Sequence, residues 1–150
     1  MGLRTYTNPG QSLGFLLHQS AISWRRSLAR ELRRIEMTPV QFFILGSTSR
    51  LTKQHSVGPT QKAIANHTLI DINVVSQVVR QLEVKGLLVR MRDETDKRAY
   101  RLVLTDTGRA KLRQAIQVVY LVDEVFFANV RPDSTFIDAV EELSNFGTSG

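Results

Sequence analysis

The sequence predicts a mainly α-helical fold with a small β-hairpin, and residues 60–108 supply the observations behind this. A short run with helical spacing is followed by a turn and by a longer helical run, which ends at Gly86. Two short β-prone runs then flank a charged turn, and another helical pattern follows them. This order of elements is that of a winged helix-turn-helix, in which the second helix of the pair enters a DNA groove.

Composition limits the class of protein further. A chain of 150 residues is expected to form one unit with a real hydrophobic core. No apolar run approaches the length of a membrane span, and the first residues lack the apolar core of a secretory signal. Cysteine is absent, which excludes disulfides and thiolate metal sites and fits a reducing compartment. We therefore expect a cytoplasmic protein with no membrane contact, no cofactor and no metal.

Charge is unevenly distributed along the chain, whose formal net charge is +6. Residues 1–79 carry nine Lys/Arg against three Asp/Glu, and residues 80–113 carry ten against five. Residues 114–150 carry one against six. A basic amino-terminal and central part attracts phosphate backbones, so this asymmetry favours double-stranded DNA as a partner. A merely solvated basic face is the simpler alternative.

The first predicted helix covers residues 12–36. Apolar residues recur at helical spacing from Leu13 through Trp24 and Leu28 to Ile35, while arginines occupy the opposite side. We interpret the apolar stripe as a dimerisation surface, with the arginine side close to DNA phosphates. Packing of the helix on its own core is the alternative.

The second predicted helix begins at a clear capping signal. Thr38 can cap it, Pro39 suits its first position, and Gln41 stands three residues after the cap. Phe42 and Phe43 follow and supply core bulk. We predict that Gly46 and the Ser/Thr-rich segment after it end this helix, so that residues 46–59 form a long loop of unassigned role. A further helical turn through Leu51 before the loop is the alternative.

The helix-turn-helix is predicted from Thr60 onward. Thr60 caps the first short helix and Asp71 caps the second, where an acidic acceptor also suits the helix dipole. One side of the second helix carries four aliphatic residues, and the other carries side chains that can bond to bases. The predicted DNA-reading residues of this recognition helix are Asn73, Ser76, Gln77 and Arg80.

The hairpin turn is the predicted wing. Asp96, Lys97 and Arg98 are its candidate DNA-binding residues, because an arginine at a wing tip can enter a narrow minor groove. Asp96 can orient Arg98 by a charge-assisted hydrogen bond. A solvated charged turn is the alternative.

Residues 106–147 are predicted to form two further amphipathic helices. Their apolar stripes are wider than one small domain requires. Together with residues 12–36 they indicate a dimer interface remote from the DNA-binding part, residues 37–105. Packing of these segments on one another within one chain is the alternative.

These segments resemble the multiple antibiotic resistance regulator (MarR) family of transcription factors. The similarity lies in the segments 37–42, 82–90 and 93–98, and in the run 102–109, Leu-Val-Leu-Thr-Asp-Thr-Gly-Arg. The resemblance implies a homodimer on a pseudo-palindromic operator, with recognition helices in major grooves and wings in the flanking minor grooves. It also implies a repressor that is released by a small aromatic or phenolic effector.

Three further interpretations concern ligands and other functions. His18, Trp24, Phe42 and Phe43 are weak candidates for the lining of an effector pocket, although packing explains them equally well. A winged-helix module with a mainly non-specific DNA-binding or a protein-binding role remains an alternative. The sequence contains no glycine-rich phosphate loop, HExxH or GxSxG motif, so we do not expect an enzyme.

Overall fold

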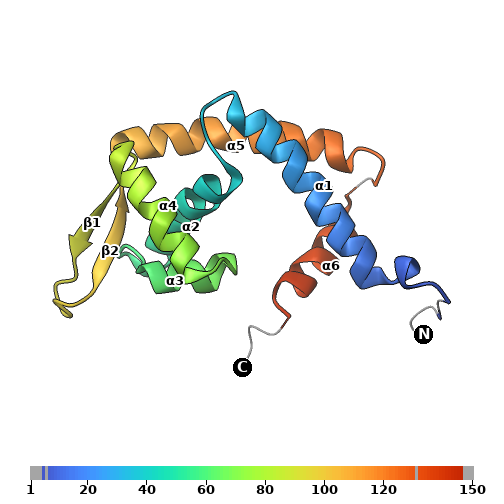
Figure 1. Ribbon diagram of the computed structural model, residues 1–150, viewed down its shortest axis with the longest axis horizontal. Helices are drawn as coiled ribbons and strands as arrows, with labels where there is room; N and C mark the ends of the chain where they lie inside the picture. The colour runs from blue at the N-terminus through green and yellow to red at the C-terminus, as the bar shows by residue number, and fades with distance from the viewer. Residues whose placement is uncertain (1–4, 6, 131, 147–150) are drawn as a thin grey trace.

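The structure is a computed structural model that describes residues 5, 7–130 and 132–146 (Figure 1). The end of the second predicted dimerisation segment, residue 147, lies outside the described residues. After a single 3-10 turn at Pro9–Gln11, the elements are α1 Leu13–Arg33, α2 Pro39–His55, α3 Gln61–Thr68, α4 Ile72–Val84, β1 Leu88–Arg92, β2 Tyr100–Leu104, α5 Asp106–Phe127 and α6 Ser134–Ser144. The predicted fold class, mainly helical with a hairpin wing, is confirmed.

Two parts are visible in Figure 1. Helices α2, α3 and α4 and the β1–β2 hairpin form one lobe, while α1 and α6 lie on the other side. Helix α5 starts beside the hairpin and runs along both parts, where it packs against α1 and α2. No helix in the described part of the chain is long and apolar enough to cross a membrane.

Capping side chains and a glycine set the ends of the helices, as the sequence predicted. Thr38 and Gln41 form the predicted capping box, because the Gln41 amide donates to the Thr38 hydroxyl at 3.2 Å and the Thr38 amide donates to the Gln41 side chain at 3.1 Å. Asp71 caps α4 by accepting from the Asn73 amide at 2.8 Å. Gly86 follows α4 with a φ of 70°, a left-handed conformation that costs glycine little.

The prediction of a long loop at residues 46–59 is wrong. Helix α2 continues through Gly46 to His55, and Ser56 ends it in the left-handed region at φ 58°. The hydroxyl of Thr48 is buried and donates to the Ile44 carbonyl at 2.8 Å. Hydroxyls that bond one turn back in this way are satisfied inside a helix, so tertiary burial outweighs the weak helix propensity of Gly, Ser and Thr.

The core lies where α2 packs against α1, α3, α4, α5 and β2. Its largest fully buried aliphatic side chains are Leu28, Leu32, Ile44, Leu45, Ile64, Leu82, Leu88 and Leu102. In the antiparallel hairpin, Leu88 pairs with Leu104 and Arg92 with Tyr100. The Leu102 amide donates to the Pro59 carbonyl at 2.8 Å, so the segment before α3 hydrogen-bonds to the other edge of β2.

The start of α5 is held against the α4–β1 junction by a very close approach. The Thr105 hydroxyl donates to the Gly86 carbonyl at 2.6 Å. A Cβ atom placed on Gly108 would lie 1.8 Å from the Leu87 carbonyl oxygen, which belongs to the backbone. Only glycine fits at this position.

We expect Gly108→Ala to lower the free energy of unfolding by about 2–3 kcal/mol, because the added methyl group displaces backbone. Gly46→Ala is the matched control, since a Cβ on Gly46 meets nothing within 4 Å. Alanine there should stabilise the interior of α2 by about 0.5–1 kcal/mol. Urea unfolding followed by circular dichroism measures both, and equal effects from the two variants would contradict the close approach at Gly108.

Candidate nucleic-acid interface

Helix α4 separates an apolar side from a polar side. Its buried side chains are Val75, Val78, Val79 and Leu82, which pack into the core below it. Asn73, Gln77 and Arg80 are exposed and Ser76 is half-buried. The predicted residues therefore share the solvent side of the helix, where Arg80 contacts the Ser76 hydroxyl at 3.5 Å.

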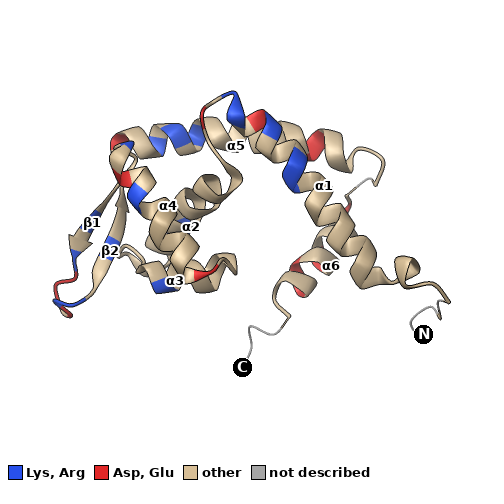
Figure 2. Ribbon diagram, viewed as in Figure 1, with Lys and Arg blue, Asp and Glu red and all other residues tan. Residues whose placement is uncertain are grey.

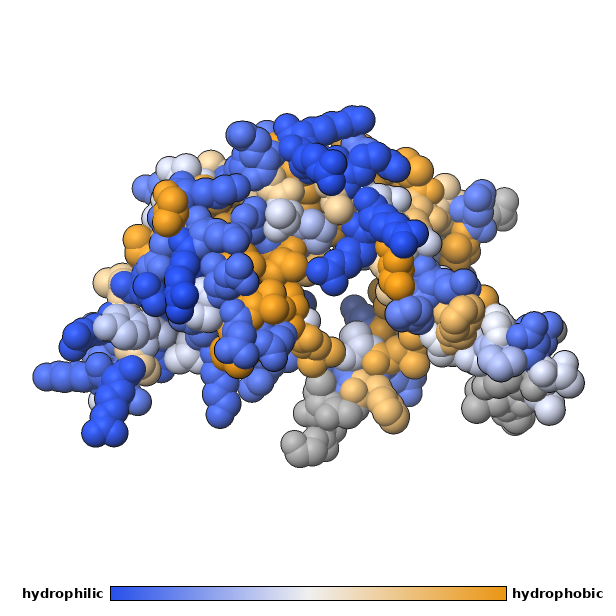
Figure 3. Space-filling view, viewed as in Figure 1, coloured by the Kyte–Doolittle hydropathy of each residue, from blue (hydrophilic) through white to orange (hydrophobic). Residues whose placement is uncertain are grey.

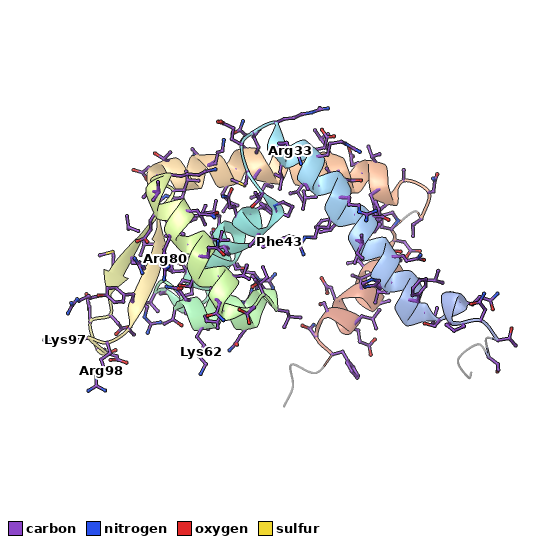
Figure 4. The ribbon with its side chains drawn as sticks, viewed as in Figure 1. Arg33, Phe43, Lys62, Arg80, Lys97 and Arg98 are labelled. Atoms are coloured by element: carbon purple, nitrogen blue, oxygen red, sulfur yellow. The ribbon has the colours of Figure 1, made fainter. Side chains whose placement is uncertain are left out.

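Cationic side chains from three elements lie on the same flank as this helix. In Figure 4, Arg80 projects from α4, Lys62 from α3, and Lys97 and Arg98 from the tip of the hairpin. Lys62, Lys97 and Arg98 are exposed. Amide and hydroxyl groups suited to base edges are thus accompanied by cations suited to phosphates.

The hairpin turn is organised by one buried carboxylate. Asp93 accepts hydrogen bonds from the Thr95 hydroxyl at 2.6 Å, the Thr95 amide at 2.8 Å and the Asp96 amide at 2.9 Å. It also forms an ion pair with Arg101 on β2. Arg101 in turn donates to the Gly58 carbonyl at 3.3 Å, which connects the wing to the segment before α3.

This network lowers the pKa of Asp93 well below its ordinary value. The hydrogen bond from the Thr95 hydroxyl is the largest cause, followed by those from the Asp96 amide, Arg101 and the Thr95 amide. The carboxylate therefore stays ionised and can accept these hydrogen bonds across the neutral and mildly acidic range.

Asp96 acts on the backbone of the tip. The sequence predicted a bond from Asp96 to the Arg98 guanidinium, but the described contact is from the Arg98 amide to Asp96 Oδ1 at 3.0 Å. The Arg98 side chain extends outward from the tip (Figure 4). Behind the tip, Arg90 and Arg92 lie 5.9 Å from the ring centre of Tyr100, which supports the cationic side of the hairpin.

Charge is unevenly distributed over the elements. Figure 2 shows Lys and Arg on the hairpin, on α3 and α4, along α5 and on the C-terminal half of α1, whereas α6 bears Asp and Glu. Figure 3 shows hydrophilic residues over the hairpin and over the C-terminal half of α1, and hydrophobic ones near the centre of this face. Cationic surface therefore extends from the hairpin lobe onto α1, while α6 carries three acidic residues and no basic ones.

The four predicted pocket residues are only partly brought together. Trp24 stacks on Phe43 with ring centres 6.2 Å apart, and Phe42 lies 5.7 Å from Phe43. The Trp24 indole donates to Asp123 of α5 at 2.7 Å, so this side chain fixes α1 on α5. His18 is exposed on α1, away from the cavity that Phe42 and Phe43 line.

That cavity, of about 370 Å³, lies between α2 and α3. Its polar lining includes Arg50, Ser47 and His67, and the His67 ring nitrogen Nδ1 lies 2.9 Å from the Ser47 hydroxyl. Partial burial, followed by the positive charge of Arg50, lowers the pKa of the His67 imidazole and so favours its neutral form. Among the described residues, no group of three or more His, Asp or Glu side chains is placed to hold a metal ion.

Comparison with known proteins agrees with this geometry. The sequence model of the MarR family matches residues 35–99. YdcH of Bacillus subtilis, an HTH-type transcriptional regulator, is 36% identical over 138 residues, which is 92% of this chain and 93% of YdcH. The chain belongs to the MarR family.

Solved MarR-family structures share the fold. The chain is similar to CouR from Rhodococcus jostii RHA1 bound to p-coumaroyl-CoA, with a TM-score of 0.80 and 19% identity over 93% of this chain and 94% of CouR. It is also similar to a mutant MarR from E. coli complexed with operator DNA, with a TM-score of 0.74 and 23% identity over 93% of this chain and 96% of that one. The protein is therefore a MarR-family transcriptional regulator with a winged helix-turn-helix.

Two features of this MarR-family chain escaped the sequence analysis. Lys62 stands two residues after the cap residue Thr60, and its place at the exposed start of α3 was a detectable signal. The Asp93–Arg101 pair was harder to find, because only the folded hairpin brings these residues together. The Asp-x-Thr spacing of residues 93–95, typical of a side-chain-stabilised turn, was the available hint.

We expect the stability difference between the wild-type protein and Asp93→Asn to shrink as the pH falls. The folded pKa of Asp93 lies below its unfolded value of about 3.9, so the carboxylate stabilises the fold above about pH 4 and loses this effect in more acidic solution. Urea unfolding midpoints between about pH 2 and pH 7 measure the difference. Glu94→Gln, at the exposed neighbouring position, is the control and should show a much smaller change.

Proposed function

We propose that this MarR-family regulator binds a pseudo-palindromic operator as a homodimer and represses transcription until a small aromatic or phenolic effector binds. The single observation that carries the proposal is the set of exposed base-reading side chains on α4, flanked by Lys62 and by the wing-tip cations (Figure 4). The effector, the operator symmetry and the repressor role rest on similarity to the family.

The recognition helix supplies sequence selectivity in this proposal. Asn73 and Gln77 present amides that pair bidentately with adenine, and Arg80 presents a guanidinium that pairs with guanine. Val74 is partly exposed beside them, where its methyl groups suit contact with a thymine methyl. Lys62 and the wing cations supply affinity through phosphates, and Arg98 inserts into the minor groove.

Apolar surface that one chain leaves uncovered supports the proposed homodimer. At the start of α1, Leu13, Leu16 and Leu17 are all about half exposed, and no residue of α6 is buried. Leu143 of α6 is 60% exposed. An apolar surface of this extent on two terminal helices is unfavourable in water, and a second copy covers it through the same helices.

The effector fits the cavity between α2 and α3. Phe42 and Phe43 offer ring faces, while Arg50 offers a cation to an acidic or phenolic oxygen. Occupation of this cavity alters the angle between α2 and α3, and therefore the position of α4. CouR, which was solved with p-coumaroyl-CoA bound, gives a precedent for a phenolic ligand in this fold.

We expect Arg98→Ala to weaken binding to a selected operator by about 1–3 kcal/mol, or roughly 5- to 150-fold, with the fold intact. Fluorescence anisotropy with duplexes recovered from a random pool measures the affinity. Arg26→Ala removes an exposed arginine of α1 and is the charge-matched comparison, which should weaken binding much less because it removes only general attraction to phosphates. Unchanged affinity in Arg98→Ala would remove the wing from the mechanism, and failure to recover any motif would contradict the sequence-specific role.

We expect Leu143→Asp to convert the protein from a dimer to a monomer, because it places a charge in the proposed interface. Sedimentation equilibrium measures the mass. Leu69→Asp is the control, since Leu69 is 80% exposed but lies in the turn between α3 and α4. A wild-type protein that is monomeric at micromolar concentration would overturn the dimer.

A further inference from the structure

One face of the hairpin is turned toward α4 and carries charged and aromatic side chains at its outer end. Its inner pair, Leu88 and Leu104, is buried in the core. Because side chains alternate between the two faces of a strand, Arg90, Arg92 and Tyr100 lie on the same face farther out. Arg92 and Tyr100 pair directly across the two strands, and the Tyr100 side chain is 42% exposed. This outer part of the face is therefore open to solvent between α4 and the wing tip.

One aromatic ring on this face attracts two guanidinium groups. The Cζ atoms of Arg90 and Arg92 each lie 5.9 Å from the centre of the Tyr100 ring, within the limit of about 6 Å for attraction between a cation and an aromatic ring. A free surface arginine samples many rotamers, and attraction to a ring restricts them. Tyr100 thus holds both guanidinium groups beside the hairpin.

The two arginines differ in the compensation of their charge. Arg90 Nε donates to Glu83 Oε1 of α4 at 3.0 Å, so its charge is paired. Arg92 is exposed and forms no ion pair with any residue that the structure describes. Glu83 stands three residues after Arg80, which places both on the same side of α4. An uncompensated cation is therefore held next to the side of α4 that carries the proposed base-reading residues.

The path of a duplex past these elements brings phosphates to the same position. In the proposed function, on which the role of this face rests, α4 lies in a major groove and the wing tip lies in the flanking minor groove. One sugar-phosphate strand separates two adjacent grooves, so this strand passes between α4 and the wing tip. The hairpin face turned toward α4 is the surface that meets it.

We propose that Arg92 binds a backbone phosphate of the strand between the two grooves, and that Tyr100 is a positioning residue that holds the Arg92 guanidinium for this contact. Arg92 supplies affinity without reading sequence, because a phosphate is the same at every base pair. Its role thus differs from that of Arg98 at the wing tip, which enters the minor groove in the proposed function.

The salt dependence of DNA binding tests the role of Arg92. Fluorescence anisotropy with a selected operator and with a random duplex, each at several salt concentrations, gives the affinity and its slope in a double-logarithmic plot. Arg92→Gln should weaken binding to both duplexes by a similar factor, about 3- to 10-fold at about 0.15 M salt, and should reduce the slope by about 0.9, the value for one lost phosphate contact. Arg26→Gln, the same change in charge on α1, should leave the slope nearly unchanged. A wild-type slope in Arg92→Gln, or weaker binding to the operator alone, would overturn the phosphate contact.

Tyr100 is tested by a conservative variant and by a double variant. Tyr100→Phe keeps the ring and should bind as the wild type does, whereas Tyr100→Leu should weaken binding to both duplexes about 2- to 5-fold. In the Arg92→Gln background, Tyr100→Leu should have no further effect, because the guanidinium that the ring positions is absent. Circular dichroism checks that each variant is folded. Equal weakening by Tyr100→Leu in both backgrounds would indicate a merely structural role in the hairpin and would overturn the positioning role.

The wing-tip variant Arg98→Ala, measured on the same duplexes, separates this contact from DNA binding as a whole. Lower affinity in Arg98→Ala together with an unchanged salt slope in Arg92→Gln would overturn the Arg92 contact and leave the proposed function standing. A wild-type protein whose affinity for both duplexes does not depend on salt would overturn the proposed function and the Arg92 contact together.

Discussion

The burial of α2 at the centre of the molecule is the constraint on which the other elements depend. Ile44 and Leu45 are fully buried, and their helix packs against α1, α3, α4, α5 and the second strand of the hairpin. The lobe that carries the proposed DNA-reading residues therefore meets the terminal helices α1 and α5 at α2. A change in the way α2 packs alters both lobes together, because closely packed interiors transmit displacement.

Much of this fold was predictable because it depends on interactions between residues that are close in the sequence. The features that were missed depend on contacts between residues that are distant in the sequence. Thr38, Asp71 and Gly86 act within one or two turns of their own positions, so their capping roles could be read from the sequence. The polar side of α4 followed from helical spacing alone. The continuation of α2 past Gly46 could not be predicted in this way, because it depends on the burial of Thr48 by other elements. The cavity between α2 and α3 and the Asp93–Arg101 pair likewise exist only after segments distant in the sequence come together.

The electrostatic arrangement has an orienting effect that no single contact provides. The wing, α3, α4 and the C-terminal half of α1 carry cations, while α6 carries three acidic residues and no basic ones. A duplex approaching in solution is attracted to the cationic elements and repelled by α6, and this effect acts over about 8 Å at physiological salt. The acidic character of α6 therefore disfavours contact between that helix and nucleic acid.

The link from Asp93 through Arg101 to the Gly58 carbonyl ties the wing to the segment before α3. This link restricts movement of the wing relative to the helix-turn-helix. In a two-fold assembly of such units, the main adjustable quantity is then the separation and rotational phase of the two units relative to the DNA repeat of about 34 Å. Control of such an assembly then becomes a matter of phasing along the duplex, with the half-site contacts themselves unchanged.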